Sequence, residues 1–259
     1  MKKRKHNIFL FRLGLILVVI ALLYSLFAYL IKLSKAHDYF KIKKVIVRGE
    51  EEGLFSYLEG QNIFDIDLKK ESEYILNLYP SYKKIRMIKM YPDRLYISFI
   101  EREPLAYVKL YRNFCVDSDL VLFDLPPKRR GLELPLIEGL ETKIFGVEAG
   151  KRYNNQELAL AISMIQAASG NRVLKEYFIE KIDLSDAYVV RCLFSSGNAS
   201  PRATYRYNKR SVTFEIKLSS EDVVRKIKIL AGILARMEND LGAIEYIDLR
   251  FKEPVIKFK

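Results

Sequence analysis

The hydrophobic pattern of the chain begins with an uncharged apolar run, Leu13–Ile31, which has Arg12 before it and Lys32 after it. As a helix with a rise of about 1.5 Å per residue, this run would approach the roughly 30 Å thickness of a bilayer's hydrocarbon core. The alternative is a cleavable signal peptide, but its apolar region typically has about 7 to 15 residues and ends at a small-x-small site, which this stretch lacks. The pattern therefore predicts a single transmembrane helix over residues 13–31.

The charges around this run predict its orientation. The N-terminal tail, residues 1–12, contains a basic cluster of Lys2, Lys3, Arg4 and Lys5. Short basic segments stay on the cytoplasmic side of a membrane. The tail is therefore predicted to be cytoplasmic, and a juxtamembrane linker over residues 32–39 would lead into an extracytoplasmic region.

Residues 40–109 have the pattern of a small α+β domain. The segment Lys41–Gly49 is rich in β-branched residues and closes on a glycine, which predicts a strand. A helix is predicted to begin at Asp67 as its N-cap and to end before Pro80. Two more strands are predicted, one over Ile85–Met90 and one in which Leu95, Ile97 and Phe99 alternate with polar residues. The predicted order is strand, helical region, helix, strand, strand.

Residues 110–259 have the pattern of a second α+β domain. A hairpin is predicted over Phe114–Phe123, and helices are predicted over Gln156–Ala168 and after Ser220, which would be the N-cap. Apolar and polar residues alternate over Val212–Leu218, which is typical of a strand with one face in water. The pattern predicts an antiparallel sheet with helices on one side.

Composition and charge add little evidence for chemistry. The formal net charge is +12, but part of it lies in the N-terminal tail. The remaining Lys and Arg are scattered among Asp and Glu, apart from short runs such as Lys128–Arg130, so we expect no nucleic-acid binding. The two histidines, His6 and His37, form no metal-ligand spacing and leave no catalytic base in the bulk of the chain. Cys115 and Cys192 lie in apolar contexts, which favours two separate buried thiols over a disulfide. We expect no enzyme, no cofactor and no metal site.

Two similar stretches place aspartates between a helix and a strand. Asp183 lies in Glu180–Ser185 and Asp248 lies in Glu245–Arg250. A pair of catalytic carboxylates is one interpretation, but no other acid, base or metal ligand accompanies either residue. We therefore favour turn residues that bond to nearby backbone.

Several motifs occur in the order that is found in FtsQ/DivIB cell-division proteins, and the chain resembles this family over nearly its whole length. These motifs are Asn62–Asp67, Tyr91–Leu95, Glu101–Ala106, Leu134–Gly139, Ile182–Ser185 and Ile247–Phe251. The resemblance implies a POTRA domain over residues 40–109 and an FtsQ/DivIB-type β domain over residues 110–259. In the family a glycine usually follows the turn of the hairpin, whereas this chain has Leu120 there. Because a bulky residue is strained in the left-handed conformation, we expect a different turn.

The resemblance implies a non-catalytic scaffold of the division septum, held in the cytoplasmic membrane. Its partners would be FtsB-like and FtsL-like proteins, membrane lipid and, through the POTRA domain, other division proteins, and it would help to control septal wall synthesis. In the family the FtsB-type partner adds by strand pairing to the C-terminal strand region. Carried over by position, the partner-binding residues are Arg250, Phe251, Val255, Ile256, Lys257 and Phe258. Arg250 would offer a charge-assisted contact, and Phe251 would be an apolar anchor.

Alternatives remain for both the strand and the function. The last strand is expected at a sheet edge, where Pro254, Lys257 and Lys259 could instead blunt the edge against pairing. The alternative function is a POTRA-containing component of protein export or outer-membrane assembly. After the POTRA domain, such a protein would need many segments of about ten residues in which apolar and polar residues alternate. The chain has few such segments. A wall enzyme anchored in the membrane would need an activated nucleophile or a carboxylate pair.

Overall fold

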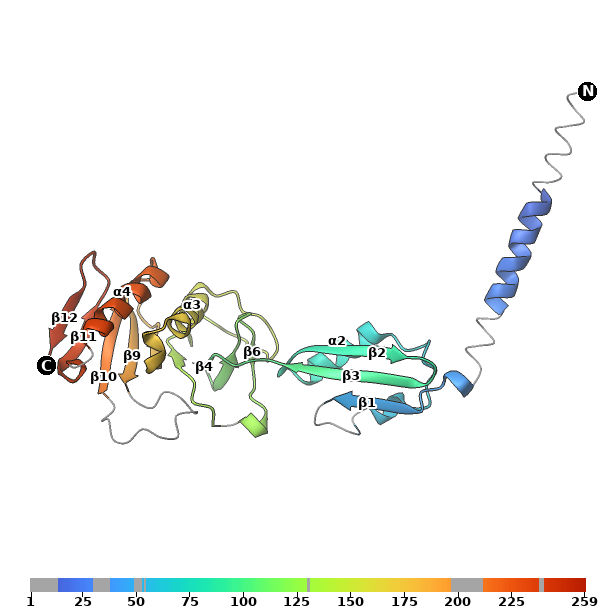
Figure 1. The fold of residues 1–259 in the computed structure, drawn as a ribbon, viewed down its shortest axis with the longest axis horizontal. Helices are drawn as coiled ribbons and strands as arrows, with labels where there is room; N and C mark the ends of the chain where they lie inside the picture. Colours follow the sequence, from blue (N-terminus) through green and yellow to red (C-terminus); the bar gives the residue numbers. More distant parts are fainter. Residues whose placement is uncertain are drawn as a thin grey trace, which may run out of the picture. The chain divides into compact units, whose positions relative to one another are not determined.

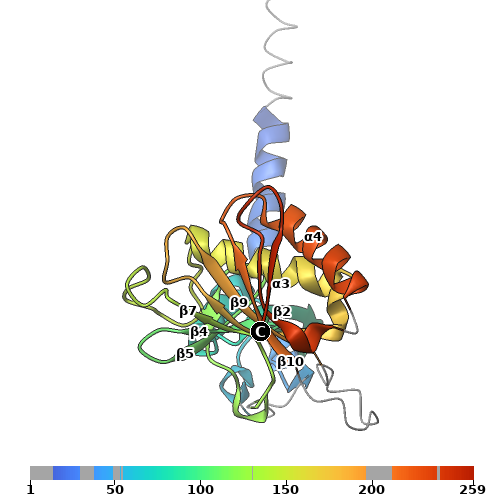
Figure 2. The same cartoon turned by 90° about the vertical axis from the view of Figure 1, so that its left-hand side faces the viewer.

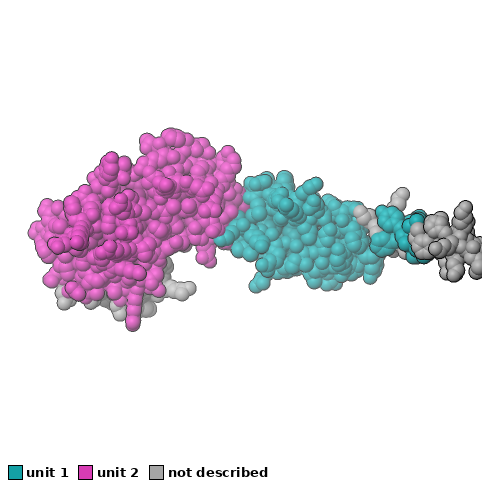
Figure 3. All heavy atoms as spheres, turned by 90° about the horizontal axis from the view of Figure 1, so that it is seen from above, with its two compact units in different colours: residues 1–78, 82–100 teal, residues 79–81, 101–259 magenta. Residues whose placement is uncertain are grey.

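The computed structural model describes residues 14–29, 38–48, 53, 55–129, 131–196, 212–237 and 240–259. The chain divides into two compact units (Figure 3). The first comprises Met1–Leu78 and Tyr82–Ile100, and the second comprises Tyr79–Ser81 and Glu101–Lys259.

The predicted transmembrane helix over residues 13–31 is not supported by the structure. Residues 14–29 are helical in the structure. Across the described ranges, no helix combines the length and the apolar character that crossing a membrane requires. This part of the predicted fold is therefore corrected.

The first unit contains a three-stranded sheet in the order β1-β3-β2. Its elements follow one another as predicted, and they are η1 (Asp38–Phe40), β1 (Lys44–Arg48), η2 (Ser56–Leu58), α2 (Leu68–Leu78), β2 (Tyr82–Met90) and β3 (Arg94–Glu101). Strand β1 pairs in parallel with β3, with Lys44 opposite Arg94. The Asp67 side chain caps α2, because its Oδ1 accepts from the backbone N–H of Lys69 at 3.1 Å and of Lys70 at 3.3 Å.

The core of the first unit is built from its strands, from α2 and from the turns around them. Its fully or almost fully buried apolar residues are Ile42, Phe55, Leu58, Ile63, Ile66, Ile75, Ile85, Leu95 and Ile97. In β3 the predicted alternation holds for Leu95 and Ile97, which are both 0% exposed. The unit therefore has a small core of its own, while its assignment as a POTRA domain stays a prediction.

The second unit contains a nine-stranded sheet in the order β12-β11-β10-β9-β8-β7-β4-β5-β6 (Figure 1). The strands are β4 (Ala106–Lys109), β5 (Asn113–Val116), β6 (Leu122–Phe123), β7 (Leu136–Glu138), β8 (Tyr177–Asp183), β9 (Val190–Ser196), β10 (Val212–Leu218), β11 (Ile244–Asp248) and β12 (Val255–Phe258). Two α-helices accompany them, α3 (Gln156–Gly170) and α4 (Val223–Arg236), together with the short 3₁₀ helices η3 (Pro127–Arg129), η4 (Leu174–Glu176) and η5 (Leu241–Ala243).

The prediction of an antiparallel sheet is wrong, because the sheet is mixed. Strand β7 is parallel to β4 and to β8, and β10 is parallel to β11, while the other pairs of described strands in this sheet are antiparallel. For the pairs β7–β8 and β10–β11, the physical reason is a helical crossover. Helix α3 lies between β7 and β8 in the chain, α4 lies between β10 and β11, and a strand–helix–strand connection between sheet neighbours makes the two strands parallel.

Helices α3 and α4 lie side by side on one face of this sheet (Figures 1 and 2). In β10, Phe214, Ile216 and Leu218 are at most 1% exposed and face the helices, while Thr213, Glu215 and Lys217 take the opposite face, as the alternating pattern predicts. Helix α4 contributes buried residues to the same core, namely Val223, Ile227, Leu230, Ala231 and Leu234. Around β10, one face of the sheet is therefore apolar and covered, and the other is polar.

Two local predictions are corrected by the backbone. Ser220 is not the N-cap of α4: the helix begins at Val223, and Asp222 occupies the N-cap position at φ +52° without a side-chain cap. A short polar side chain such as that of Asp tolerates this left-handed conformation better than most. Leu120 also has a left-handed backbone, with φ +61°. The turn therefore keeps the conformation that glycine favours, against our expectation of a different turn.

Candidate partner-binding edge

Strand β12 forms one end of the nine-stranded sheet and pairs only with β11 among the described strands (Figure 1). The pairing is antiparallel, with Val255 opposite Asp248 and Ile256 opposite Ile247. A β-bulge between Ile244 and Tyr246 shifts the register of β11, while β12 itself runs without an extra residue. The expected edge position of the last strand is therefore confirmed.

The backbone of β12 offers hydrogen-bonding groups on its outer side. The N–H of Lys259 donates to the carbonyl of Ala243 at 2.8 Å, so Lys259 directs its main-chain groups toward the rest of the sheet. Successive residues of a strand in an antiparallel pair direct these groups to opposite sides. The N–H and C=O groups of Ile256 and Phe258 therefore point away from β11, in the direction from which an added strand would approach.

The side chains of β12 divide between the two faces of the sheet. Val255 and Lys257 share the polar face with their partners on β11, whereas Ile256 and Phe258 share the helix-covered face with buried Ile247 and Ile244. Ile256 is half-buried against the core, while Phe258 is 51% exposed and Val255 is 48% exposed. Phe251, in the loop before the strand, is 61% exposed. An exposed apolar side chain therefore flanks the edge on each face.

Arg250 is already paired within the chain. Its Nη2 lies 2.7 Å from Oδ2 of Asp248, its Nε lies 3.0 Å from Oδ1, and its backbone N–H also donates to Oδ1 at 3.0 Å. Burial alone would raise the pKa of the Asp248 carboxyl, but the side-chain and backbone hydrogen bonds from Arg250 hold that pKa below its ordinary value. The guanidinium also lies 5.4 Å from the centre of the Phe251 ring. A partner's acid would therefore compete with Asp248 for Arg250.

Lys257 is paired as well. Its Nζ lies 2.9 Å from a carboxylate oxygen of Glu245, and the hydrogen bond to this carboxylate raises the pKa of the lysine. The same Nζ lies 5.6 Å from the centre of the Tyr246 ring, and Nζ of Lys217 lies 3.8 Å from that ring. Sequence reasoning did not identify Glu245, Tyr246 and Lys217, although the alternation in Val212–Leu218 had placed Lys217 on the wet face.

The two aspartates of the repeated motif do not form a catalytic pair. Asp183 is opposite Arg191, Arg191 is opposite Lys217 and Lys217 is opposite Asp248, so two strands separate the carboxylates. At about 4.8 Å per strand they lie roughly 14 Å apart, beyond the roughly 5 to 9.5 Å of a glycosidase pair. Oδ1 of Asp183 accepts from the N–H of Ser185 at 2.9 Å, and Asp248 accepts from Arg250 in the same way. The interpretation as turn residues is confirmed.

Other groups that could support chemistry are buried or dispersed. The thiols of Cys115 and Cys192 are free and at most 2% exposed, as the prediction of two separate buried thiols requires. Burial raises the pKa of Cys115 to about 12 and raises that of Cys192 as well. The described residues contain no group of three or more His, Cys, Asp or Glu side chains that could hold a metal ion.

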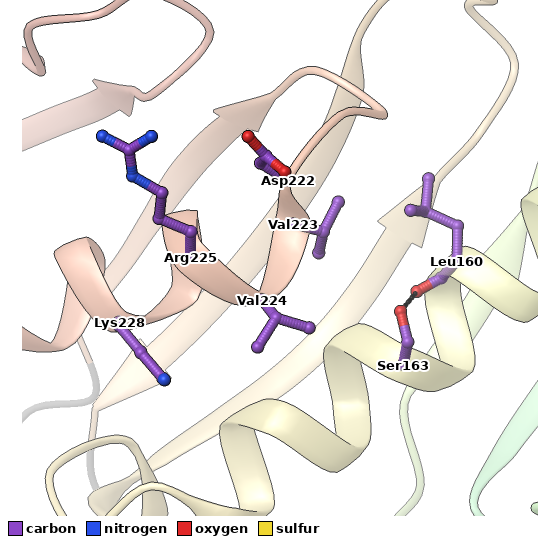
Figure 4. Close-up of a pocket in the computed structure, with 7 residues that line it drawn as sticks. All are labelled: Leu160, Ser163, Asp222, Val223, Val224, Arg225 and Lys228. Atoms are coloured by element: carbon purple, nitrogen blue, oxygen red, sulfur yellow. Dashed lines mark hydrogen bonds between the residues drawn. The ribbon is translucent and has the colours of Figure 1, made fainter.

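A groove of about 510 Å³ lies between α3 and the start of α4 (Figure 4). It is lined by Leu160, Ser163, Asp222, Val223, Val224, Arg225 and Lys228. Ser163 donates its hydroxyl to the carbonyl of Leu160 at 2.7 Å, and the side chains of Arg225 and Lys228 extend in different directions. The charged groups do not converge on one point, so we assign no ligand to this groove.

Comparisons with known proteins identify relatives that all carry the same protein name. The protein named cell division protein FtsQ from Syntrophotalea carbinolica is 24% identical over 228 residues, which cover 85% of this chain and 74% of the relative. Proteins of the same name from Geotalea daltonii and Geobacter sp. are 23% and 24% identical, and they cover 82% and 76% of this chain. These two alignments span 71% and 65% of the relatives' own lengths. No protein-family model matches the chain.

Proposed function

We propose that this chain, a member of the FtsQ family of cell-division proteins by its similarity to three proteins of that name, acts in division as a scaffold that binds an FtsB-like partner at β12. The partner would add a strand to the open edge, and an FtsL-like protein would join through the same complex. The scaffold would thereby help to control septal wall synthesis, with no chemistry of its own.

The single observation that carries this proposal is the edge position of β12. Outward main-chain groups at Ile256 and Phe258 supply donors and acceptors for an added strand, and main-chain bonds of this kind give affinity in strand addition. Exposed Phe251, Val255 and Phe258 supply the apolar contacts on either side. The alternative role of Lys257 in blunting the edge is weakened because its ammonium already pairs with Glu245.

The first experiment removes one outward donor. Proline at position 258 lacks the N–H that faces the partner, and proline is tolerated where a strand's N–H faces solvent. Phe258→Ala is the matched control, since it removes the same ring but keeps the N–H. We expect Phe258→Pro to weaken binding of the FtsB-like protein about tenfold more than Phe258→Ala does, as one lost hydrogen bond implies. Titration calorimetry of the full chain with its own FtsB-like protein measures this, and equal affinities for the two variants would refute strand addition.

The second experiment tests the predicted anchor. Phe251→Ala is expected to weaken binding of the FtsB-like protein. Phe145→Ala is the control, because Phe145 lies elsewhere in the second unit and its ring is even more exposed, 75% against 61% for Phe251. We expect Phe145→Ala to leave binding unchanged. Arg250→Glu is less informative, because it would place two carboxylates beside each other at Asp248 and disturb the turn itself. Unchanged binding by Phe251→Ala would show that Phe251 does not contact the partner. The test of strand addition at Phe258 does not depend on that result.

A further inference from the structure

Four aromatic rings form a continuous surface on the first unit. Ring centres are 5.2 Å apart for Tyr39 and Phe40, 5.1 Å apart for Phe40 and Phe64, and 5.4 Å apart for Phe64 and Tyr91. Tyr39 is 56% exposed, Phe64 is 38% exposed and Tyr91 is 60% exposed. We call these four residues the aromatic cluster. The core of the unit does not use these exposed ring faces, which is why they require another explanation.

The cluster is held in place by main-chain bonds between the segments that carry it. The N–H of Ile63 donates to the carbonyl of Phe40 at 2.9 Å, which joins η1 to the turn before α2. The N–H of Lys43 donates to the carbonyl of Asp93 at 2.9 Å, which joins the start of β1 to the turn between β2 and β3. Figure 1 shows η1 and this turn at the same end of the unit. The rings are therefore presented as a preformed surface.

Three cations near the cluster already pair with acids of the same unit. Nζ of Lys41 lies 2.7 Å from Asp38, Nζ of Lys43 lies 3.2 Å from Asp93, and Arg94 lies 3.8 Å from Asp93. A strongly acidic partner would find few unpaired cations there. The surface that remains combines two phenylalanine rings with two tyrosines, whose amphipathic rings suit the boundary between lipid headgroups and acyl chains.

The position of the cluster in the chain favours a lipid surface over a protein partner. The helix over residues 14–29 is uncharged, and its large apolar side chains are between 47% and 73% exposed. Nine peptide steps separate Tyr29 from Asp38, so at about 3.6 Å per step Asp38, which directly precedes the cluster, lies at most about 32 Å from Tyr29. An apolar phase that receives these side chains is therefore within reach of the cluster.

We propose that the aromatic cluster docks on the surface of a lipid bilayer, with its rings at the level of the headgroups. This contact requires no helix that crosses the bilayer. It concerns the first unit alone and is independent of strand addition at β12.

The test uses the fact that the chain contains no tryptophan. Tyr91→Trp introduces a single fluorophore into the cluster of the full chain. Tyr188→Trp is the control, because Tyr188 is 82% exposed and lies in the second unit. With phosphatidylcholine vesicles that contain brominated acyl chains, we expect a blue shift and loss of emission for Tyr91→Trp and neither effect for Tyr188→Trp.

Two further substitutions distinguish lipid binding by the cluster from lipid binding by the helix over residues 14–29, because the helix is identical in every variant. Tyr39→Ser with Phe64→Ser, added to Tyr91→Trp, is expected to abolish the quenching while the melting transition of the second unit stays unchanged. Three results would overturn the proposal: no quenching of Tyr91→Trp, equal quenching of Tyr188→Trp, or quenching that the serine substitutions leave in place. A strict requirement for anionic lipid would also overturn it, since the lysines rather than the rings would then make the contact.

Discussion

Leu120 shows how a single residue can be held in a conformation that its side chain disfavours. Its N–H donates to the carbonyl of Asp117 at 3.2 Å and its carbonyl accepts from Tyr153 at 2.9 Å. Oδ1 of Asp117 accepts from Asp119 at 2.9 Å and from Val121 at 3.0 Å, while its other oxygen lies 2.7 Å from Nη1 of Arg102. The turn is fixed on both sides of Leu120, so the left-handed backbone persists despite a penalty of about 1 to 2 kcal/mol.

This strain gives a testable difference between two substitutions. Leu120→Gly and Leu120→Ala both remove the side chain's contact with the core, but only glycine relieves the left-handed backbone. We expect the glycine variant to be more stable than the alanine variant by about 1 kcal/mol in urea unfolding. An alanine variant as stable as the glycine variant would show that the turn relaxes.

Asp248 gives a second prediction at this scale, through the pH dependence of stability. Its pKa in the folded chain is held below the ordinary value of about 3.9, so its ion pair with Arg250 contributes fully at neutral pH and is lost as the pH falls through the folded-state pKa. Asp248→Asn keeps an oxygen for the turn but removes the charge. We expect it to be less stable than the wild type by about 1 kcal/mol at pH 7, since Arg250 is partly exposed. The difference should shrink as the pH falls through the folded-state pKa of Asp248, and a constant difference across the pH range would contradict this account.

Residue by residue, the sequence predicted local bonding better than backbone conformation. Asp67 as a helix cap, Asp183 and Asp248 as turn residues and the separate thiols follow from side-chain chemistry that acts over a few residues. The conformation of Leu120 was misjudged because it depends on a contact with a distant segment, the bond to Tyr153. The pairing of Lys257 with Glu245 requires the β11–β12 register, which no local pattern contains.

At the scale of elements, the hydrophobic pattern predicted most strands and both large helices, but not how the strands pair. The alternation in β10 indicates one solvent-facing side whether the neighbouring strand is parallel or antiparallel. It therefore could not predict that β11 pairs with β10 in parallel. The direction of strand pairing could have been predicted from the order of the elements along the chain. Each long helix lies between two strands that became parallel neighbours, and the crossover rule applied to β7–α3–β8 and β10–α4–β11 would have predicted the mixed sheet.

At the scale of the whole molecule, the two units have separate cores, and the thiols report on one of them. The second unit's core contains Cys192, and Cys115 is buried in its strand β5. Because both thiols are buried and protonated, they should react with a thiol reagent only when the second unit opens.

This arrangement predicts different effects for two core substitutions. Ile97→Ala in the first unit and Leu230→Ala in the second both truncate side chains that are 0% exposed, and each should destabilise its own unit by about 2 to 5 kcal/mol. Leu230→Ala is expected to accelerate labelling of Cys115 and Cys192 by Ellman's reagent, while Ile97→Ala leaves the rate unchanged. Equal acceleration by the two variants would mean that the units unfold together.

The two ends of the nine-stranded sheet are unlike each other. At the β6 end, Leu122 donates its N–H to Lys151 at 3.1 Å and accepts from Gly150 at 2.7 Å, and Val121 forms a bridge with Arg152. The segment Gly150–Arg152 thus occupies that side of a strand only two residues long, whereas β12 has no such cover among the described residues. If a partner adds a strand to this sheet as proposed, growth would proceed in one direction only, and addition would be limited to one strand per chain. Two copies that met through β12 would close this edge on both chains, so the nine-stranded sheet could not extend further.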